Sequence, residues 1–205
     1  GIIETLSLTD GLVSQQLALK KYHRSLLESG EYWRQSMTRF NAQNRVDATL
    51  ISNLRIMRRT LINQISKRCD KSKEIITGVV HALLSRSIFI KYLEERKDSN
   101  GETVFPQDFY CNFMESAKWY TDVLNSKEAT YNLFLTLKDK FNGDTLQVSE
   151  IETEIITQDD LDELRTFILG NSELESRQLT LWPLYSFDII PIQLISSIYE
   201  LFFHL

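Results

Sequence analysis

The chain has 205 residues, 42% of them hydrophobic and 25% charged, a composition that is ordinary for a globular protein and excludes a disordered or collagen-like one. Its two cysteines are too few for a disulfide framework and are typical of a reducing compartment, so we expect a cytoplasmic location. The apolar start at Ile2 and Ile3 is too short for a signal peptide, and Glu4 follows it.

The net charge of −5 is unevenly distributed along the chain. Residues 45–97 carry 12 Lys and Arg against 5 Asp and Glu, whereas residues 98–205 carry 6 against 19. A basic segment beside an acidic one indicates an anionic partner for the basic segment. The alternative is that the two segments neutralise each other across an internal interface.

Only 7 Gly and 3 Pro occur, and both residue types disfavour helices. We therefore expect an all-α fold, a multi-helix bundle around a long antiparallel helical hairpin at about 44–96. Residues 1–43 precede the hairpin and are expected to form short helices, with a break near Ser29 and Gly30.

The clearest helix is expected from about Asn44 to Lys67. Its apolar residues recur at steps of three and four and share one stripe. They are Val46, Leu50, Leu54, Met57, Leu61 and Ile65. Arg45, Arg55 and Arg59 lie on the opposite side of this helix, and Arg58 flanks the stripe.

A second helix is expected from about Lys73 to Arg96. Its apolar residues come in adjacent pairs, beginning with Ile75 and Ile76, and a stripe of that width predicts burial on more than one side. Only a short polar link separates the two helices. We therefore expect them to form an antiparallel hairpin, to which residues 44–98 are assigned.

Residues 99–180 form the acidic part of the chain. After a loop at 97–103, two amphipathic helices are expected, at Phe109–Leu124 and Ser126–Phe141. The dipeptide Asn142–Gly143 then predicts a turn.

One more helix is expected in the acidic part. It would begin at Thr157, because Asp160 three residues later can complete a capping box, and would end at Gly170. A polar connector is expected at 171–180.

Residues 181–205 are expected to form a connector helix. Pro191 suits the first turn of a helix, where its missing N–H costs nothing. After it, apolar residues at helical spacing share one face: Ile192, Ile195, Tyr199 and Phe202. No polar tail follows this face, so we expect the chain to be part of a longer protein.

Residues 187–200, Phe-Asp-Ile-Ile-Pro-Ile-Gln-Leu-Ile-Ser-Ser-Ile-Tyr-Glu, are similar to the segment just ahead of the catalytic domain in N6-adenine DNA methyltransferases. This family includes fused type II restriction–modification enzymes. Residues 83–96 are similar to its LLxRxIFxxYLEDR helix, with Glu95 where the family usually has Asp, and residues 140–144 resemble its FNGD turn. The three stretches occur in the family's order, and the resemblance covers roughly residues 44–205.

The resemblance implies a non-catalytic helical region that connects and orients catalytic domains and helps to hold duplex DNA. The parent enzyme would use S-adenosylmethionine. The family's cofactor turn and its Pro-Pro-Tyr/Phe loop are missing from these 205 residues, so no catalytic, cofactor-binding or metal-binding residue is assigned here. The expected partners are double-stranded DNA and a downstream methyltransferase domain. Binding to a membrane is not expected.

The candidate DNA contacts are basic residues, because Lys and Arg bind phosphates and give affinity with little sequence information. They are Arg45, Arg55, Arg58, Arg59, Lys67, Arg68, Lys71 and Lys73. Among them we expect Arg55, Arg58 and Arg59 to contribute most. The alternative is an ordinary solvated helix face.

Arg86 and Arg96 differ from these residues, because they flank the wide stripe of the second helix. Both are expected to form ion pairs, with Glu94, Glu95 or the acidic half. The triplet Glu95–Lys97 has the Glu-x-Lys spacing of metal-dependent nucleases, but that chemistry needs a strand, and here the triplet ends a helix. The three histidines are far apart in sequence, so no metal site is expected.

A rival hypothesis is a protein-interaction module. Its acidic half and apolar C-terminal helix would dock a partner subunit. An enzyme in its own right is disfavoured by the missing catalytic motifs.

Overall fold

The computed structural model of the protein describes three continuous stretches, residues 42–98, 100–141 and 146–170. It also describes five single residues: Phe187, Ile190, Leu194, Ile195 and Ile198. Side chains are described from residue 49 onward. The chain divides into two compact units, Gly1–Ala42 and Gln43–Leu205, and all the helices below lie in the second unit apart from the first residue of α5.

Several expected elements lie outside the described residues. They are the short helices of 9–40, the turn at 142–143, the connector at 171–180 and most of the connector helix in 181–205.

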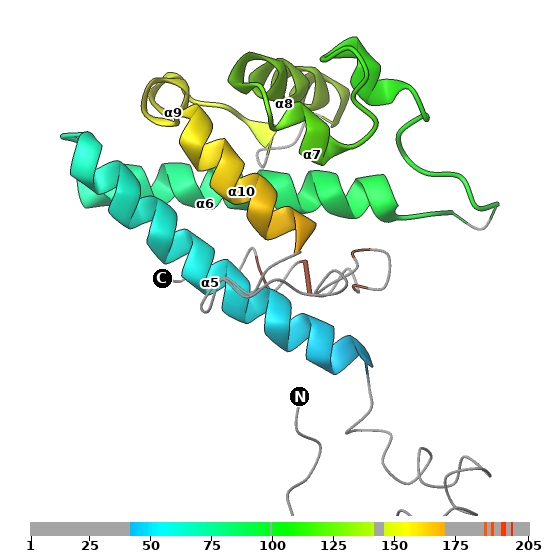
Figure 1. Cartoon of the computed structure of the whole chain (residues 1–205), viewed down its shortest axis with the longest axis horizontal. Helices are drawn as coiled ribbons and strands as arrows, with labels where there is room; N and C mark the ends of the chain where they lie inside the picture. The colour runs from blue at the N-terminus through cyan, green and yellow to red at the C-terminus, as the bar shows by residue number, and fades with distance from the viewer. Residues whose placement is uncertain are drawn as a thin grey trace, which may run out of the picture. The chain divides into compact units, whose positions relative to one another are not determined.

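The described residues form helices joined by loops, and no strand occurs among them (Figure 1). The α-helices are α5 (Ala42–Arg68), α6 (Lys73–Glu95), α7 (Tyr120–Val123), α8 (Lys127–Phe141), α9 (Glu150–Ile155) and α10 (Gln158–Leu169), and a 3-10 helix, η1, spans Phe109–Asn112. The loop after α6 contains one isolated antiparallel bridge, between Lys97 and Thr103. The expected all-α fold is confirmed for this part of the chain.

Helices α5 and α6 form the expected hairpin, with ends within two residues of the predicted ones. Figure 1 shows that they run in opposite directions and diverge from the turn that joins them. Ser72 ends this turn, and its hydroxyl accepts a hydrogen bond from the Ile75 backbone N–H at 3.4 Å, which caps α6. The described members of the predicted α5 stripe are all buried: Leu50, Leu54, Met57, Leu61 and Ile65.

The predicted continuous helix Phe109–Leu124 is wrong. The segment instead forms the short helices η1 and α7, separated by a non-helical stretch. Ser116 has a φ of 69°, a left-handed conformation through which a right-handed helix cannot continue. The Asp122 carboxylate then accepts hydrogen bonds from the backbone N–H groups of Lys118 and Trp119, at 2.9 and 3.0 Å. These bonds satisfy donors at the N-terminus of α7, where a new helix begins.

Helices α8 and α10 are confirmed. Asp160 caps α10 by accepting hydrogen bonds from the Thr157 backbone N–H at 2.8 Å and from its hydroxyl at 3.1 Å. Gly170 ends α10 with a φ of 60°, which glycine adopts without steric cost. Helix α9 was not predicted separately, although Ser149 and Glu152 have the spacing of a capping box and the Ser149 hydroxyl accepts from the Glu152 N–H at 3.1 Å.

Replacing Ser149 with alanine should remove this cap. We expect Ser149→Ala to lower the free energy of unfolding by about 1 kcal/mol, measured by urea denaturation. A matched control is Thr166→Ala, because Thr166 is exposed on α10 and caps nothing. A Ser149→Ala loss no larger than that of the control would contradict the assigned cap.

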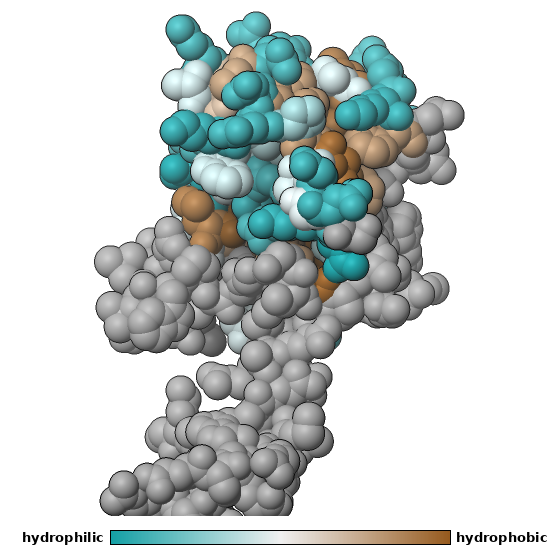
Figure 2. Space-filling view, turned by 90° about the vertical axis from the view of Figure 1, so that its right-hand side faces the viewer, coloured by the Kyte–Doolittle hydropathy of each residue, from teal (hydrophilic) through white to brown (hydrophobic). Residues whose placement is uncertain are grey.

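Helix α6 is the central element of the core. Its buried apolar residues are Ile76, Val79, Val80, Leu83, Leu84, Ile88, Ile90 and Tyr92. By length and composition α6 alone among the described helices could cross a membrane, but 61% of its most apolar stretch is buried inside the protein. On the face shown in Figure 2, hydrophilic side chains cover most of the described surface, as expected for packing of the apolar residues inside.

Candidate nucleic-acid interface

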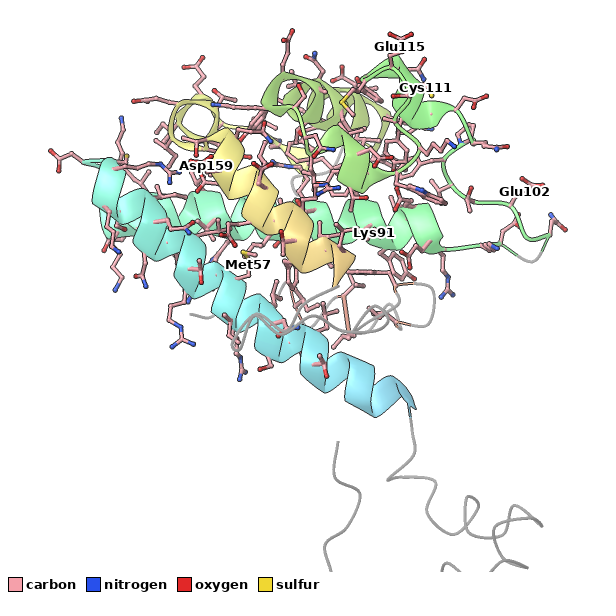
Figure 3. All side chains as sticks on the ribbon, viewed as in Figure 1. Met57, Lys91, Glu102, Cys111, Glu115 and Asp159 are labelled. Carbon is pink, nitrogen blue, oxygen red and sulfur yellow. The ribbon has the colours of Figure 1, made fainter. Side chains whose placement is uncertain are left out.

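The exposed side of α5 carries the first candidate DNA contacts. Arg55, Arg59 and Lys67 are exposed, and no ion pair forms to any of them within the described residues. Asp and Glu are absent from α5 after Asp47, so no carboxylate of this helix competes for these cations. Figure 3 shows nitrogen-tipped side chains projecting from the lower edge of α5.

Uncharged donors share this exposed side. They are Ser52, Asn63 and Ser66. The sequence-based hypothesis missed them because it considered cations alone, although they stand three or four residues from Arg55, Arg59 or each other. Their amide and hydroxyl groups can also donate hydrogen bonds to phosphates.

Arg58 lies at the border between the exposed side and α6. Its Nε donates a hydrogen bond to Nε2 of His81 at 2.5 Å, which joins the two helices of the hairpin. An imidazole nitrogen that accepts this bond carries no proton, so the hydrogen bond requires neutral His81. Arg58 therefore has a structural contact that Arg55 and Arg59 lack.

The basic residues at the tip of the hairpin face the acidic half instead. Arg68 forms an ion pair with Asp160 and donates to the Ile155 carbonyl at 3.3 Å. Lys71 pairs with Glu154 at 3.4 Å. At this end of the hairpin the two oppositely charged segments meet and neutralise each other, as the alternative interpretation of the charge asymmetry expected.

The last two candidates are Lys73 and Arg45. Lys73 is exposed at the first residue of α6, beside Glu74. Arg45 lies on α5, but its side chain is outside the described ones. The structure thus brings Arg55, Arg59 and Lys67 together on one exposed surface and directs Arg68 and Lys71 elsewhere.

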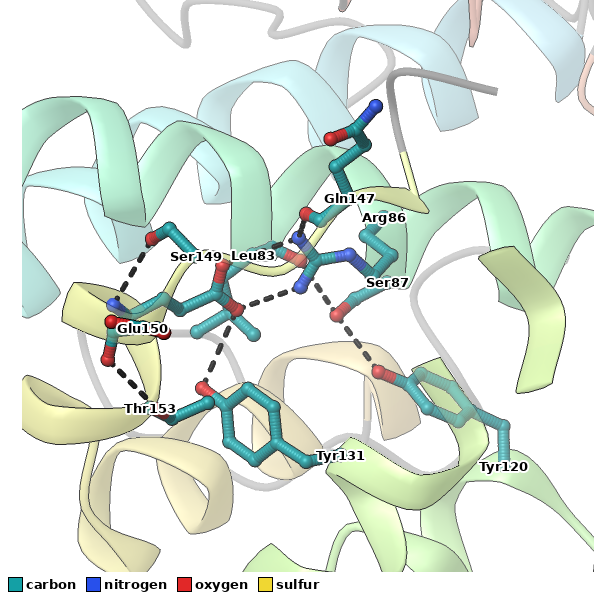
Figure 4. A network of polar contacts seen from close by, with 10 residues as sticks. Leu83, Arg86, Ser87, Tyr120, Tyr131, Gln147, Ser149, Glu150 and Thr153 are labelled. Carbon is teal, nitrogen blue, oxygen red and sulfur yellow. Dashed lines mark hydrogen bonds and ion pairs between the residues drawn. The ribbon is translucent and has the colours of Figure 1, made fainter. Parts of the chain in front are cut away.

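A second polar cluster lies inside the fold (Figure 4). Arg86 and Glu152 are both buried and form an ion pair at 2.7 Å, with a second contact at 3.2 Å. The guanidinium also donates to the Gln147 carbonyl and stacks 4.6 Å from the centre of the Phe134 ring. The expected ion pair of Arg86 with the acidic half is confirmed, and it binds α6 to α8 and α9.

The polar side chains farther along α6 also form their hydrogen bonds and ion pairs within the protein. Ser87 shares a hydrogen bond of 2.8 Å with the Tyr120 hydroxyl, and the buried Glu94 accepts from the Tyr120 backbone N–H at 2.5 Å. Lys91 pairs with Glu94 and, at 2.8 Å, with Glu95. These groups hold α7 against α6, so we assign them a structural role.

Arg96 forms no ion pair among the described residues, although one was expected. It is exposed, and its guanidinium lies 5.8 Å from the centre of the Tyr92 ring. Glu95 is the last residue of α6, as expected, and Lys97 forms the isolated bridge to Thr103. In the part of the chain that the structure describes, no three His, Cys, Asp or Glu side chains are grouped to hold a metal ion.

The three stretches with the family resemblance contact one another. In chain order they are residues 83–96, 140–144 and 187–200. Phe89 of the first stretch packs edge-on against Phe141 of the second, with ring centres 6.5 Å apart. Glu95 of the first stretch accepts a hydrogen bond from the Phe187 backbone N–H of the third at 2.7 Å. Segments separated by about 90 residues in sequence therefore form one structural unit around α6.

Comparisons with protein families, with curated proteins and with solved structures find no match for this chain. Its function is therefore inferred from the described residues and from the three stretches.

Proposed function

We propose that this chain is a non-catalytic helical region of an adenine-specific DNA methyltransferase or restriction–modification enzyme. In this proposal its packed helices orient the catalytic domains, and the exposed side of α5 contacts the phosphates of duplex DNA. S-adenosylmethionine would be bound by a methyltransferase domain outside these 205 residues. The observation that carries the DNA contact is the exposed set Arg55, Arg59 and Lys67, to which no carboxylate of the described residues forms an ion pair.

Support for the family comes from the contacts among the three resembling stretches. Phe89 with Phe141, and Glu95 with Phe187, join them around one helix. If the family shares these sequence patterns because they hold one structural unit together, the stretches that carry them should contact one another, as Phe89 and Phe141 do here. The coding sequence that follows the Leu205 codon tests the family directly, since it should encode an Asn/Asp/Ser-Pro-Pro-Tyr/Phe loop.

Reversing the charge of Arg55 and Arg59 tests the DNA contact. We expect Arg55→Glu/Arg59→Glu to bind a fluorescent 20-base-pair duplex at least tenfold more weakly in an anisotropy titration. Each lost phosphate contact should reduce the slope of log affinity against log salt by about 0.9, so two lost contacts should reduce it by about 1.8.

The matched control is Lys138→Glu/Lys140→Glu on α8, which changes the net charge by the same amount on another helix. Its affinity should fall much less than that of the α5 variant. Equal losses in both variants would mean that net charge, and not α5, governs binding. Circular dichroism of both variants should match the parent, because all four side chains lie at or near the surface.

The second candidate function, a module that docks a partner subunit, is favoured by one observation. A groove of about 480 Å³ between α6 and α9 has the exposed Ile75 and Ile151 in its lining. The apolar C-terminal residues Leu194, Ile195 and Ile198 are buried within the chain, so among the described residues the groove, and not this C-terminal segment, offers an apolar surface to a partner. Ile151→Glu should then weaken binding of the partner subunit in a pull-down without changing DNA affinity.

A further inference from the structure

Five exposed donors of α5 form a narrow ridge. We define this donor ridge as Ser52, Arg55, Arg59, Asn63 and Ser66, all of which are exposed. At 100° per residue the five positions fall within an arc of roughly 80° around the helix axis. With a rise of 1.5 Å per residue, the ridge is about 21 Å long.

The chemistry of the ridge goes beyond what phosphate binding requires. Cations are sufficient for binding phosphates. The third position of the central set Arg55, Arg59 and Asn63 is an uncharged amide, which can donate to a phosphate but can also pair with a base edge. Arginine forms paired hydrogen bonds with O6 and N7 of guanine, and asparagine with N6 and N7 of adenine. These are the side chains that distinguish base pairs by their edges.

We infer that α5 lies in the major groove of B-form DNA and that at a preferred sequence Arg55, Arg59 and Asn63 contact base edges, in place of the phosphates that the two arginines contact on other duplexes. This inference rests on the proposed function. The major groove is about 12 Å wide and admits one α-helix. The three residues follow one another at intervals of four, or about 6 Å along the helix, so that together they can span about four base pairs at 3.4 Å per step.

Side chains beside the ridge suit the walls of such a groove. Arg58 lies roughly 100° to one side of Arg59 around the axis, and Lys67 roughly 80° to the other side. Donors on both sides of a helix in the groove would approach the two phosphate backbones, which positions the helix without reading sequence. Thr60, half-buried on the same side as Lys67, adds a hydroxyl donor there.

Selection of bound duplexes from a randomised library tests the inference with the whole chain. After several rounds at moderate salt, the bound pool should be enriched in a short motif that contains guanine and adenine. Asn63→Ala should abolish the preference for adenine at one position of that motif and leave the others. Its affinity for an unselected duplex should fall much less than that of Arg55→Glu/Arg59→Glu, because the substitution removes no charge.

The control variant is Asn132→Ala, at an exposed asparagine of α8 outside the ridge, which should select the unchanged motif. A duplex RNA of matching sequence should compete poorly, because the deep, narrow major groove of A-form RNA does not admit a helix.

Three results would overturn the inference. Salt-sensitive binding without any enriched motif would limit α5 to phosphates and leave the proposed function intact. Equal competition by the RNA duplex would have the same consequence. An absence of binding at low salt would overturn the proposed DNA contact as well.

Discussion

We expect Arg86→Met to lower the free energy of unfolding by about 3–5 kcal/mol, the largest loss from any single substitution proposed for this chain. The methionine fills much of the volume of the arginine but leaves the Glu152 carboxylate buried without its cation. Glu152 is 1% exposed, and the remaining partner of its carboxylate among the described residues is the Tyr131 hydroxyl at 3.4 Å. Urea denaturation followed by circular dichroism measures the loss.

A second variant separates two free energies: the cost of leaving the Glu152 carboxylate buried without a cation, and the net contribution of the Arg86–Glu152 ion pair to stability. In Arg86→Met/Glu152→Leu both partners are apolar, so no charge is left buried. We expect this double variant to be more stable than Arg86→Met alone, because much of the cost of breaking a buried pair is the desolvation of the remaining ion.

The exposed pair Lys71–Glu154 provides the control. Its side chains are 34% and 63% exposed, so solvent screens the attraction. Lys71→Ala should therefore cost less than about 1 kcal/mol. If Arg86→Met cost no more than this control, the ion pair between Arg86 and Glu152 would not contribute to the stability of the core in the way assigned here.

The hairpin could be predicted from sequence because its signals are local. The stripe of α5 repeats over five turns, and both helix ends lie next to a short polar link. Periodicity also placed Arg55 and Arg59 on the exposed side, since it depends only on 3.6 residues per turn. The α10 cap is equally local, with Thr157 and Asp160 three residues apart.

The pairing of the hairpin tip could not be predicted in the same way. Arg68 and Asp160 are 92 residues apart in sequence, and Lys71 and Glu154 are 83 apart. Only the packing of α9 and α10 against the hairpin brings them together. The break in Phe109–Leu124 had a local cause, Ser116 and the Asp122 cap, but apolar periodicity continues across it and concealed it.

Stability should fall steeply above pH 10, and three buried tyrosines are the reason. Burial raises the pKa of Tyr110, Tyr120 and Tyr131 well above the ordinary value of about 10, and the nearby Glu94 and Glu152 carboxylates add to the increase for Tyr110 and Tyr131 respectively. The folded state therefore keeps these phenols protonated where the unfolded chain loses their protons. Their stabilising contribution is complete below pH 10 and is lost as the pH rises towards the folded-state pKa.

The size of the effect follows from the number of groups. Each such tyrosine removes about 1.4 kcal/mol per pH unit once the unfolded phenol is ionised, so three remove about 4 kcal/mol per unit. Since small domains have total stabilities of about 5–15 kcal/mol, unfolding is expected within a few pH units above 10. Urea denaturation at half-unit steps of pH measures the slope, and tyrosinate absorbance should rise together with the loss of helix.

Tyr110→Phe isolates one of the three groups. Phenylalanine keeps the ring that packs against Phe105 and Phe109 but has no proton to lose. The variant should therefore lose stability above pH 10 with a slope smaller by about 1.4 kcal/mol per unit. An unchanged slope would mean that the Tyr110 hydroxyl reaches solvent and ionises in the folded protein. Tyrosinate absorbance that rises before the helices melt would lead to the same conclusion, because ionisation would then not require unfolding.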